Sequence, residues 1–323
     1  MEEARNKSST TTTNSCKIRK RYGLVSFHEL PDYMKDNEYI LEYYRAKWPL
    51  TQALFSLFRW HNETLNVWTN FSTTAETHSK ASTFEGSTQQ IPLKHDPSVY
   101  FDSASAETNP TSWPFFVFLG GSMFCLLSSS ICHLFCCHSH HLNIKLVQMD
   151  YVGITIMIIA SFFPPIYYIF ICSPRWQIVY LSGITIIGVC TVLALLSPSF
   201  STGKYRPLRT LLFLSMGLFG LFPAVHGLIV NWNDPHRNIT LVYESVMALS
   251  YIIGAMFYVT RVPERWRPGW FDLVGQSHQI FHVFVMLGAL AHYGAAQIFL
   301  EYRGWDGIKT NIPVFHAFGS IDI

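Results

Sequence analysis

Six long apolar stretches constrain this chain more than any other feature of its sequence. Each approaches the length of about 20 residues at which a helix crosses the hydrocarbon layer of a membrane. Because backbone polar groups in lipid must be satisfied internally, we predict helices rather than strands. The fold class is therefore expected to be all-α, a polytopic membrane helix bundle with six clear spans. The predicted spans are Phe115–Cys132, Val152–Cys172, Ile178–Leu196, Leu211–Val230, Thr240–Val259 and Ile280–Leu300.

Composition excludes other classes of protein. Only 14% of the residues are Asp, Glu, Lys or Arg, whereas soluble proteins carry about 25%. The formal net charge is +2 and no basic stripe lies on a helical face, so we expect no nucleic-acid partner. The cysteines form no C-x-x-C pair and no secreted spacing, so a disulfide scaffold is not predicted. We expect an integral, multi-pass protein of the plasma membrane or an endomembrane.

Positive charge alternates between the loops on the two sides of the predicted bundle. By the positive-inside rule, the loops after the first, third and fifth spans are cytosolic, and the C-terminus is then outer or lumenal. Those loops carry Lys145, Lys204, Arg206, Arg209, Arg261, Arg265 and Arg267. The opposite loops carry only Arg175 and Arg237.

The predicted domain organisation has five parts. Residues 1–47 are predicted to be a basic disordered tail. Residues 48–69 alternate apolar and polar positions, which favours an amphipathic helix lying on the membrane surface. Residues 70–112 form a polar insert that we do not expect to span a bilayer. The membrane helix bundle is predicted over 113–300 and a C-terminal tail over 301–323.

A pair of histidines at the start of the last span is the first candidate for chemistry. His278 and His282 are four residues apart, so both imidazoles would lie on one helix face and could reach one metal ion. The pattern alone is weak, because two interfacial histidines that hydrogen-bond to loop carbonyls would look the same. Inside a membrane segment, however, ionisable side chains are costly and usually functional.

The predicted topology adds a third histidine and a carboxylate at the same depth. His133 ends the first span, and Asp150 precedes the second on the same face. Three histidines with one open position are the ligand set of a catalytic zinc ion, so we predict Zn²⁺ at His133, His278 and His282. Asp150 could orient water or act as a base, although it could equally be an ordinary helix N-cap. Ser129, one turn before His133, faces the same way.

Other polar residues within the spans are weaker candidates. We expect His226 and His292 to be hydrogen-bonded packing residues. Glu244 is expected either to line a cavity or to extend to the membrane interface. The residues expected to kink their helices are Pro164, Pro165 and Pro223.

Several motifs together resemble a known family. They are HNETLNVWT (residues 61–69), SSICH (129–133), Asp150-Tyr151, RVPER (261–265) and SHQIFH (277–282). This combination resembles the progestin and adipoQ receptor family, and within it the plant heptahelical transmembrane proteins, which are relatives of adiponectin receptors. The resemblance covers about residues 24–69 and 113–300.

The resemblance implies seven helices, a cytosolic N-terminus and a zinc ion near the cytosolic face, held by the three histidines already named. It also implies that Asp150 is bonded through the zinc-bound water and that Ser129 belongs to an S-x-x-x-H motif. Adiponectin receptors are similar to alkaline ceramidases, and a lipid amidase activity has been attributed to them. Membrane lipids are thus expected partners, and a ceramide-like lipid is an expected substrate. Plant members are described as receptors that respond to hormones, sugars or stress.

The chain departs from the family pattern after Thr69. In the family this motif runs directly into the first transmembrane helix, whereas Asn70-Phe71-Ser72 and a long polar stretch follow here. The first helix is therefore predicted to be missing. The leading hypothesis is a heptahelical receptor-like protein with a zinc site competent for lipid amide hydrolysis. Two alternatives stay open: a non-enzymatic signalling receptor whose zinc is structural, and a truncated, non-functional isoform.

Overall fold

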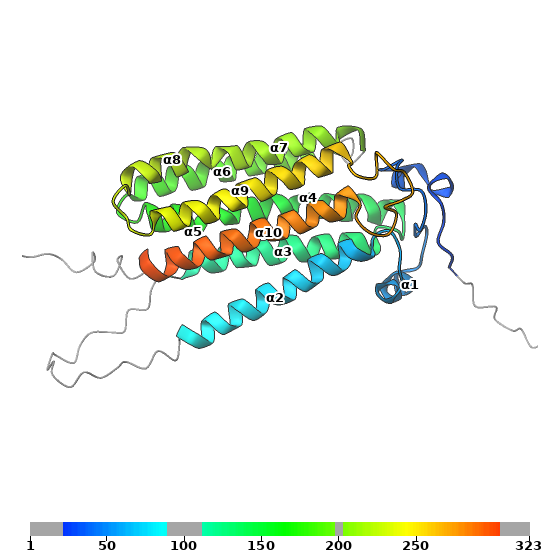
Figure 1. Cartoon of the computed structure of the whole chain (residues 1–323), viewed down its shortest axis with the longest axis horizontal. Helices are drawn as coiled ribbons and strands as arrows, with labels where there is room; N and C mark the ends of the chain where they lie inside the picture. The colour runs from blue at the N-terminus through cyan, green and yellow to red at the C-terminus, as the bar shows by residue number, and fades with distance from the viewer. Residues whose placement is uncertain (1–21, 89–111, 198–202, 304–323) are drawn as a thin grey trace, which may run out of the picture.

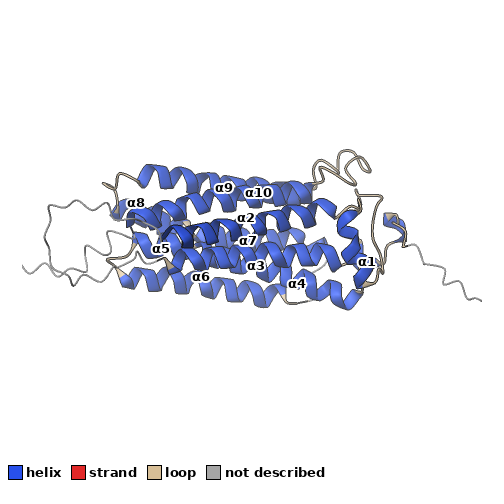
Figure 2. Cartoon of the chain, turned by 90° about the horizontal axis from the view of Figure 1, so that it is seen from below, coloured by secondary structure: helices blue, strands red, loops and turns tan. Residues whose placement is uncertain are grey.

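The regular structure in the described part of the chain is helical. The computed structural model describes residues 22–88, 112–197 and 203–303, and it shows long helices lying side by side (Figures 1 and 2). No strand is formed within these ranges. Six helical segments are long and apolar enough to cross a membrane, and each overlaps one of the six predicted spans. They are Trp113–Phe135, His140–Ile169, Pro174–Leu195, Arg206–Val230, Arg237–Thr260 and Ser277–Glu301.

Prolines divide two of these segments. A proline lacks the N–H that would bond to the preceding turn of a helix. Pro164 and Pro165 lie just after the break between α4 and α5, and Pro223 lies just after the break between α7 and α8. The predicted kinks are present, each as a break of the helix just before the proline. The four pieces are α4 (His140–Ser161), α5 (Phe163–Ile169), α7 (Arg206–Phe219) and α8 (Leu221–Val230).

The remaining apolar helices complete the bundle. The α9 and α10 helices pack against each other, as do α3 and α4, and α6 packs on α4. The bounds are α3 (Trp113–Phe135), α6 (Pro174–Leu195), α9 (Arg237–Thr260) and α10 (Ser277–Ile298), which continues as a π-helix over Phe299–Arg303. The end of α3 and the starts of α4 and α10 lie at one end of the bundle (Figure 1).

A seventh long helix, α2 (Thr64–Thr88), lies along α3 and α10 (Figures 1 and 2). It has 25 residues, but it is too polar to count among the apolar segments. It begins at the end of the bundle where α3 stops and runs antiparallel to α3. The structure therefore differs from the predicted boundary at residues 69 and 70, because one helix continues through it. Residues 89–111 of the predicted insert lie outside the described residues.

Polar side chains form the inward face of α2. Asn66, Asn70 and Thr73 are buried, and they recur at the spacing of one helix face. The side-chain amide of Asn70 donates to Oγ of Ser129 on α3 over 3.1 Å. Oγ1 of Thr73 lies 2.8 Å from Sδ of Met286 on α10. Side chains of α3 and α10 therefore provide polar contacts for Asn70 and Thr73, which helps a polar helix to occupy this position.

The chain before α2 folds over the end of the bundle where α3 stops (Figure 1). Leu30, Ile40 and Tyr44 form a small buried cluster there. The described part of the predicted disordered tail, residues 22–47, is thus folded, and residues 1–21 lie outside the described residues. Four short elements follow one another: the 3₁₀ helices Phe27–Glu29 and Asp32–Met34, the helix α1 (Leu50–Phe55) and the 3₁₀ helix Ser56–Phe58. The surface helix predicted over 48–69 is therefore much shorter than expected.

Charged contacts fix this N-terminal segment to the loops of the bundle. Arg206 pairs with Asp36, and Arg261 pairs with Glu38. The carboxylate of Asp272 accepts hydrogen bonds from the backbone N–H groups of residues 41 and 42, over 3.0 and 2.9 Å. The segment is thus bound to the first residue of α7 and to the loop between α9 and α10.

Glu264 holds the first residue of α10 in place. Its side chain is fully buried, and Oε2 accepts the N–H of Ser277 over 2.7 Å. Oε1 accepts the hydroxyl of Ser277 and also the amide of Asn37 over 3.1 Å. The carboxylate therefore satisfies one of the free N–H groups at the start of a helix and joins that helix to the N-terminal segment.

We predict that Glu264→Ala destabilises the protein by about 3 kcal/mol, because it leaves buried hydrogen-bonding groups of Ser277 and Asn37 without a partner. The measurement is unfolding of the purified protein in detergent. Glu42→Ala, at an exposed carboxylate of the same segment, is the matched control and should change stability by less than about 0.5 kcal/mol. Equal effects of the two substitutions would contradict this role of Glu264.

Candidate metal centre

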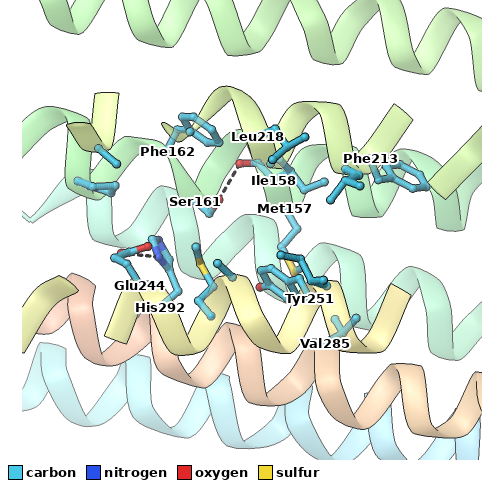
Figure 3. A pocket seen from close by; sticks show the side chains of 18 of the residues that line it. Met157, Ile158, Ser161, Phe162, Phe213, Leu218, Glu244, Tyr251, Val285 and His292 are labelled. Atoms are coloured by element: carbon cyan, nitrogen blue, oxygen red, sulfur yellow. Dashed lines mark hydrogen bonds and ion pairs between the residues drawn. The ribbon is translucent and has the colours of Figure 1, made fainter. Parts of the chain in front are cut away.

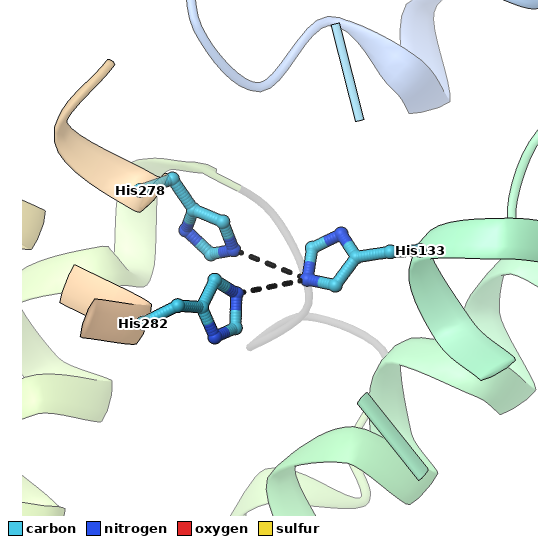
Figure 4. Close-up of side chains that lie close together, drawn as sticks. All are labelled: His133, His278 and His282. Atoms are coloured by element: carbon cyan, nitrogen blue, oxygen red, sulfur yellow. Dashed lines mark hydrogen bonds between the residues drawn. The ribbon is translucent and has the colours of Figure 1, made fainter. Parts of the chain in front are cut away.

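Three histidine rings meet at the end of the bundle that the N-terminal segment covers (Figure 4). His133 lies in the last turn of α3, and His278 and His282 lie in the first turns of α10. Nε2 of His133 is 3.3 Å from Nε2 of His278 and 3.2 Å from Nε2 of His282. The structure therefore brings together all three histidines that the sequence singled out. Their ligand atoms lie within 4.8 Å of one another, so the group could hold a metal ion.

A carboxylate that the sequence analysis did not select fixes the ring of His133. Oε2 of Glu63 lies 2.8 Å from Nδ1 of His133. A carboxylate accepts only, so the contact places the proton of a neutral His133 on Nδ1 and leaves Nε2 with a lone pair. That lone pair points toward the other two imidazoles (Figure 4). A carboxylate on the outer nitrogen is the usual partner of a metal-binding histidine.

Local hydrogen bonds before α2 place Glu63. Oγ1 of Thr64 accepts the N–H of His61 over 2.9 Å, and Nδ1 of His61 accepts the N–H of Glu63 over 3.1 Å. Burial, together with the nearby charge of Arg45, lowers the pKa of His61 to about 3. His61 is therefore neutral at physiological pH, and its Nδ1 stays available as the acceptor.

The same turn is joined to α10. The carbonyl oxygen of Asn62 accepts the side-chain amide of Gln276 over 2.8 Å and that of Gln279 over 3.4 Å. These two residues flank His278 in the sequence. The turn that carries Glu63 is thus held beside the helix that carries two of the histidines.

Arg45 of the N-terminal segment closes the end of α3. Its guanidinium is buried and donates to the carbonyls of His133 and Leu134 over 2.7 and 3.0 Å. The last carbonyls of a helix have no partner within the helix, and a cation also suits the negative end of the helix dipole. Arg45 therefore satisfies the backbone at the residue that carries the first imidazole.

Asp150 and Ser129 lie beside the histidines. Asp150 is within the long helix α4, which begins at His140, so it is not the helix N-cap that we considered as the alternative. It interacts with Ser129 and lies close to His133. Asp150, Ser129, His278 and His282 all line one cavity. The histidine cluster thus has a carboxylate and a hydroxyl on its cavity side.

The cavity has a volume of about 580 Å³, which is within the range of about 300–1,000 Å³ for small-molecule sites. It extends from the histidines along α4, α7, α8, α9 and α10, and its wall is mainly apolar (Figure 3). Met157, Tyr251 and Val285 lie on this wall. An apolar chain could therefore bind with one end at the histidine cluster.

The weaker candidates have distinct positions. Nδ1 of His226 lies 2.9 Å from the hydroxyl of Tyr180, so this histidine is a hydrogen-bonded packing residue as predicted. His292 is buried, but it also lines the cavity, as does Glu244. Nδ1 of His292 lies 2.9 Å from Oε1 of Glu244. Of the two predictions for Glu244, the cavity position is confirmed.

Comparison with known proteins decides the family. The sequence profile of haemolysin-III-related proteins matches residues 58–293. This chain belongs to the haemolysin-III-related family. The match begins before α2 and ends within α10, so it includes every element that forms the histidine cluster. The predicted resemblance to adiponectin-receptor-like proteins is confirmed, and the family and the six apolar segments identify an integral, multi-pass membrane protein.

Curated relatives within the haemolysin-III-related family include plant and animal proteins. The chain is 58% identical over 287 residues to heptahelical transmembrane protein 1 of Arabidopsis thaliana, which covers 89% of this chain and 84% of that protein. It is 50% identical over 324 residues to heptahelical transmembrane protein ADIPOR1 of Oryza sativa subsp. japonica, covering 88% and 86%. It is 34% identical over 279 residues to the adiponectin receptor protein of Drosophila melanogaster, covering 86% and 60%. These names support a receptor-like membrane protein.

We predict that Glu63→Gln weakens metal binding about 10- to 100-fold, because His133 loses the carboxylate that orients its ring and raises its basicity. Titration of the metal-depleted protein against a competing chelator measures the affinity. The control is Glu42→Gln, at an exposed side chain of the same segment. If both variants bind metal as wild type does, Glu63 does not support the histidine cluster.

Proposed function

We propose that this receptor-like protein holds Zn²⁺ at His133, His278 and His282 and hydrolyses the amide bond of a long-chain lipid such as a ceramide. The observation that carries the proposal is the position of the histidine cluster at the end of an apolar cavity, with Asp150 and Ser129 on the same wall. The family names support a membrane receptor, and the site chemistry supports a hydrolytic step within it.

The spacing of the imidazoles favours zinc. Zinc–nitrogen bonds of about 2.0–2.1 Å at tetrahedral angles require nitrogen atoms about 3.3–3.4 Å apart. The two Nε2–Nε2 separations from His133 are 3.3 and 3.2 Å. Neutral imidazoles with a carboxylate on the outer nitrogen of one ring form a donor set that suits this ion.

The cavity favours a catalytic role over a structural one. Structural zinc sites are closed by four protein ligands, whereas catalytic sites keep one position open. Within the described residues, the group that could hold a metal contains the three histidines and no fourth ligand. The cavity wall beside them carries Asp150 and Ser129. A substrate carbonyl and a water molecule could therefore both reach the cluster from the cavity.

Each side chain then has a defined task in amide hydrolysis. Bound zinc would supply a Lewis acid that polarises the carbonyl and lowers the pKa of water. Asp150 would accept a proton from the attacking water and pass it to the amide nitrogen. Ser129 would orient Asp150, and the apolar wall would bind the acyl chain. A bond forms between the water oxygen and the acyl carbon, the C–N bond breaks, and a fatty acid and an amine leave.

We predict that His278→Ala removes both zinc and hydrolysis, whereas Asp150→Ala keeps about one zinc per chain and lowers hydrolysis at least about 100-fold. Metal content and release of a labelled fatty acid from a ceramide measure the two properties. His141→Ala, at an exposed histidine near the same end of the bundle, is the matched control.

A different outcome would favour the second candidate function, a signalling receptor with a structural zinc ion. In that case wild-type protein holds zinc without releasing fatty acid, and His278→Ala lowers thermal stability without any turnover to lose. Absence of zinc from wild-type protein would overturn both forms of the proposal and favour the truncated isoform. The observation that supports the signalling receptor as the second candidate is the receptor names of the relatives.

A further inference from the structure

The part of the cavity away from the histidine cluster contains a second polar pair, His292 on α10 and Glu244 on α9 (Figure 3). The ring of His292 is only 2% exposed to solvent. Nδ1 faces Oε1 of Glu244 at 2.9 Å, and Nε2 has no hydrogen-bond partner within the described part of the chain. Most buried polar atoms in proteins have such a partner. This imidazole therefore leaves a buried polar atom without a partner beside a largely apolar cavity.

Packing alone does not require a polar pair at this position. The ring of Phe118 lies edge-on against His292, with centroids 4.6 Å apart, and an apolar ring would make the same contact. Ionisable side chains inside membrane segments are costly and usually functional. The pair is thus better explained by a ligand group that hydrogen-bonds to it from the cavity.

The distance along α10 gives the length of that ligand. At a rise of about 1.5 Å per residue, His292 lies about 15 Å beyond His282 and about 21 Å beyond His278. His278 and His292 are also nearly a whole number of turns apart, so they project from similar faces of the helix. An extended chain advances about 1.2 Å per bond, as the polypeptide backbone does, so these distances correspond to about 13 to 18 bonds. That is the length of a long-chain acyl group.

We propose that the cavity binds a long-chain acyl lipid that carries a hydroxyl group near the far end of its chain, and that His292, oriented by Glu244, accepts a hydrogen bond from this hydroxyl. The proposal rests on the proposed function, because that function places the acyl carbonyl at the histidine cluster. It adds the chemical class of the substrate, an ω-hydroxyacyl lipid rather than one with a plain alkyl chain.

The chemistry of the pair favours a hydroxyl over other polar groups. Because Nδ1 of His292 faces the Glu244 carboxylate, which only accepts, the ring proton lies on Nδ1 and Nε2 keeps a lone pair. A hydroxyl has the proton that it can donate to this lone pair. A carboxylate at the end of the chain would be repelled by Glu244. An ammonium group would lose its hydration on entering a mainly apolar cavity. The hydroxyl is a neutral group that can donate a hydrogen bond to Nε2 of His292.

Binding of free fatty acids tests this inference without any turnover. The probes are hexadecanoic acid and its ω-hydroxy derivative, each competing with a fluorescent fatty acid for the full-length protein in detergent. We expect wild-type protein to bind the ω-hydroxy acid about fivefold more tightly, as one added hydrogen bond would give. His292→Phe should abolish this preference while binding hexadecanoic acid as wild type does.

Two further variants keep the test sharp. His292→Gln keeps a hydrogen-bonding side chain and should keep most of the preference, and His226→Phe replaces a membrane histidine that does not line the cavity and should keep all of it. Equal affinity of wild type for the two acids would overturn the proposal. So would a preference that survives in folded His292→Phe protein.

The metal-site variant His278→Ala separates this proposal from the proposed function. It should weaken binding of both acids by a similar factor and leave their ratio unchanged, because His292 is remote from the carboxylate end. A preserved ratio in His278→Ala, together with absence of ceramide hydrolysis by wild-type protein, would support the hydroxyl site and contradict the hydrolase. Ceramide hydrolysis by wild-type protein without any preference between the acids would support the hydrolase and contradict the hydroxyl site.

Discussion

The contact between Glu63 and His133 is the interaction on which the histidine cluster depends. It joins a turn at the start of α2 to the end of α3, and hydrogen bonds from Gln276 and Gln279 join the same turn to α10. Three segments that are far apart in the sequence are thereby held at one point. Arg45 reinforces the arrangement by binding the carbonyl of His133. A metal ion bound there would be supported by the N-terminal segment as well as by the helices.

The N-terminal segment therefore contributes to the histidine cluster, although it is polar and lies outside the apolar helices. Residues 22–63 cover the end of the bundle at which the histidines lie, and ion pairs of Arg206 and Arg261 hold them there. Glu63 and Arg45, which contact His133, both belong to this segment. The histidine cluster is therefore in direct contact with the segment that covers the predicted cytosolic end of the bundle.

The sequence was sufficient to predict the apolar helices and the three histidines. Length and apolar composition determine the spans. Alternating loop charge places the end of the first span and the start of the last span at one face of the membrane. The sequence was not sufficient to predict the long helix α2, because a hydropathy average cannot show that Asn70 and Thr73 face partners on α3 and α10. Glu63 was missed for a related reason: its partner His133 is distant in the sequence, and no local spacing joins them. The motif HNETLNVWT, which contains Glu63, was the available signal.

The coordination of the metal tests the central claim most directly. X-ray absorption at the zinc edge of the purified, full-length protein reports the type and number of ligand atoms. We predict three imidazole nitrogens and one oxygen at about 2.0–2.1 Å. A fourth nitrogen or a sulfur from the protein would show a closed, structural site. Protein that contains no zinc after purification and reconstitution with the ion would contradict the account.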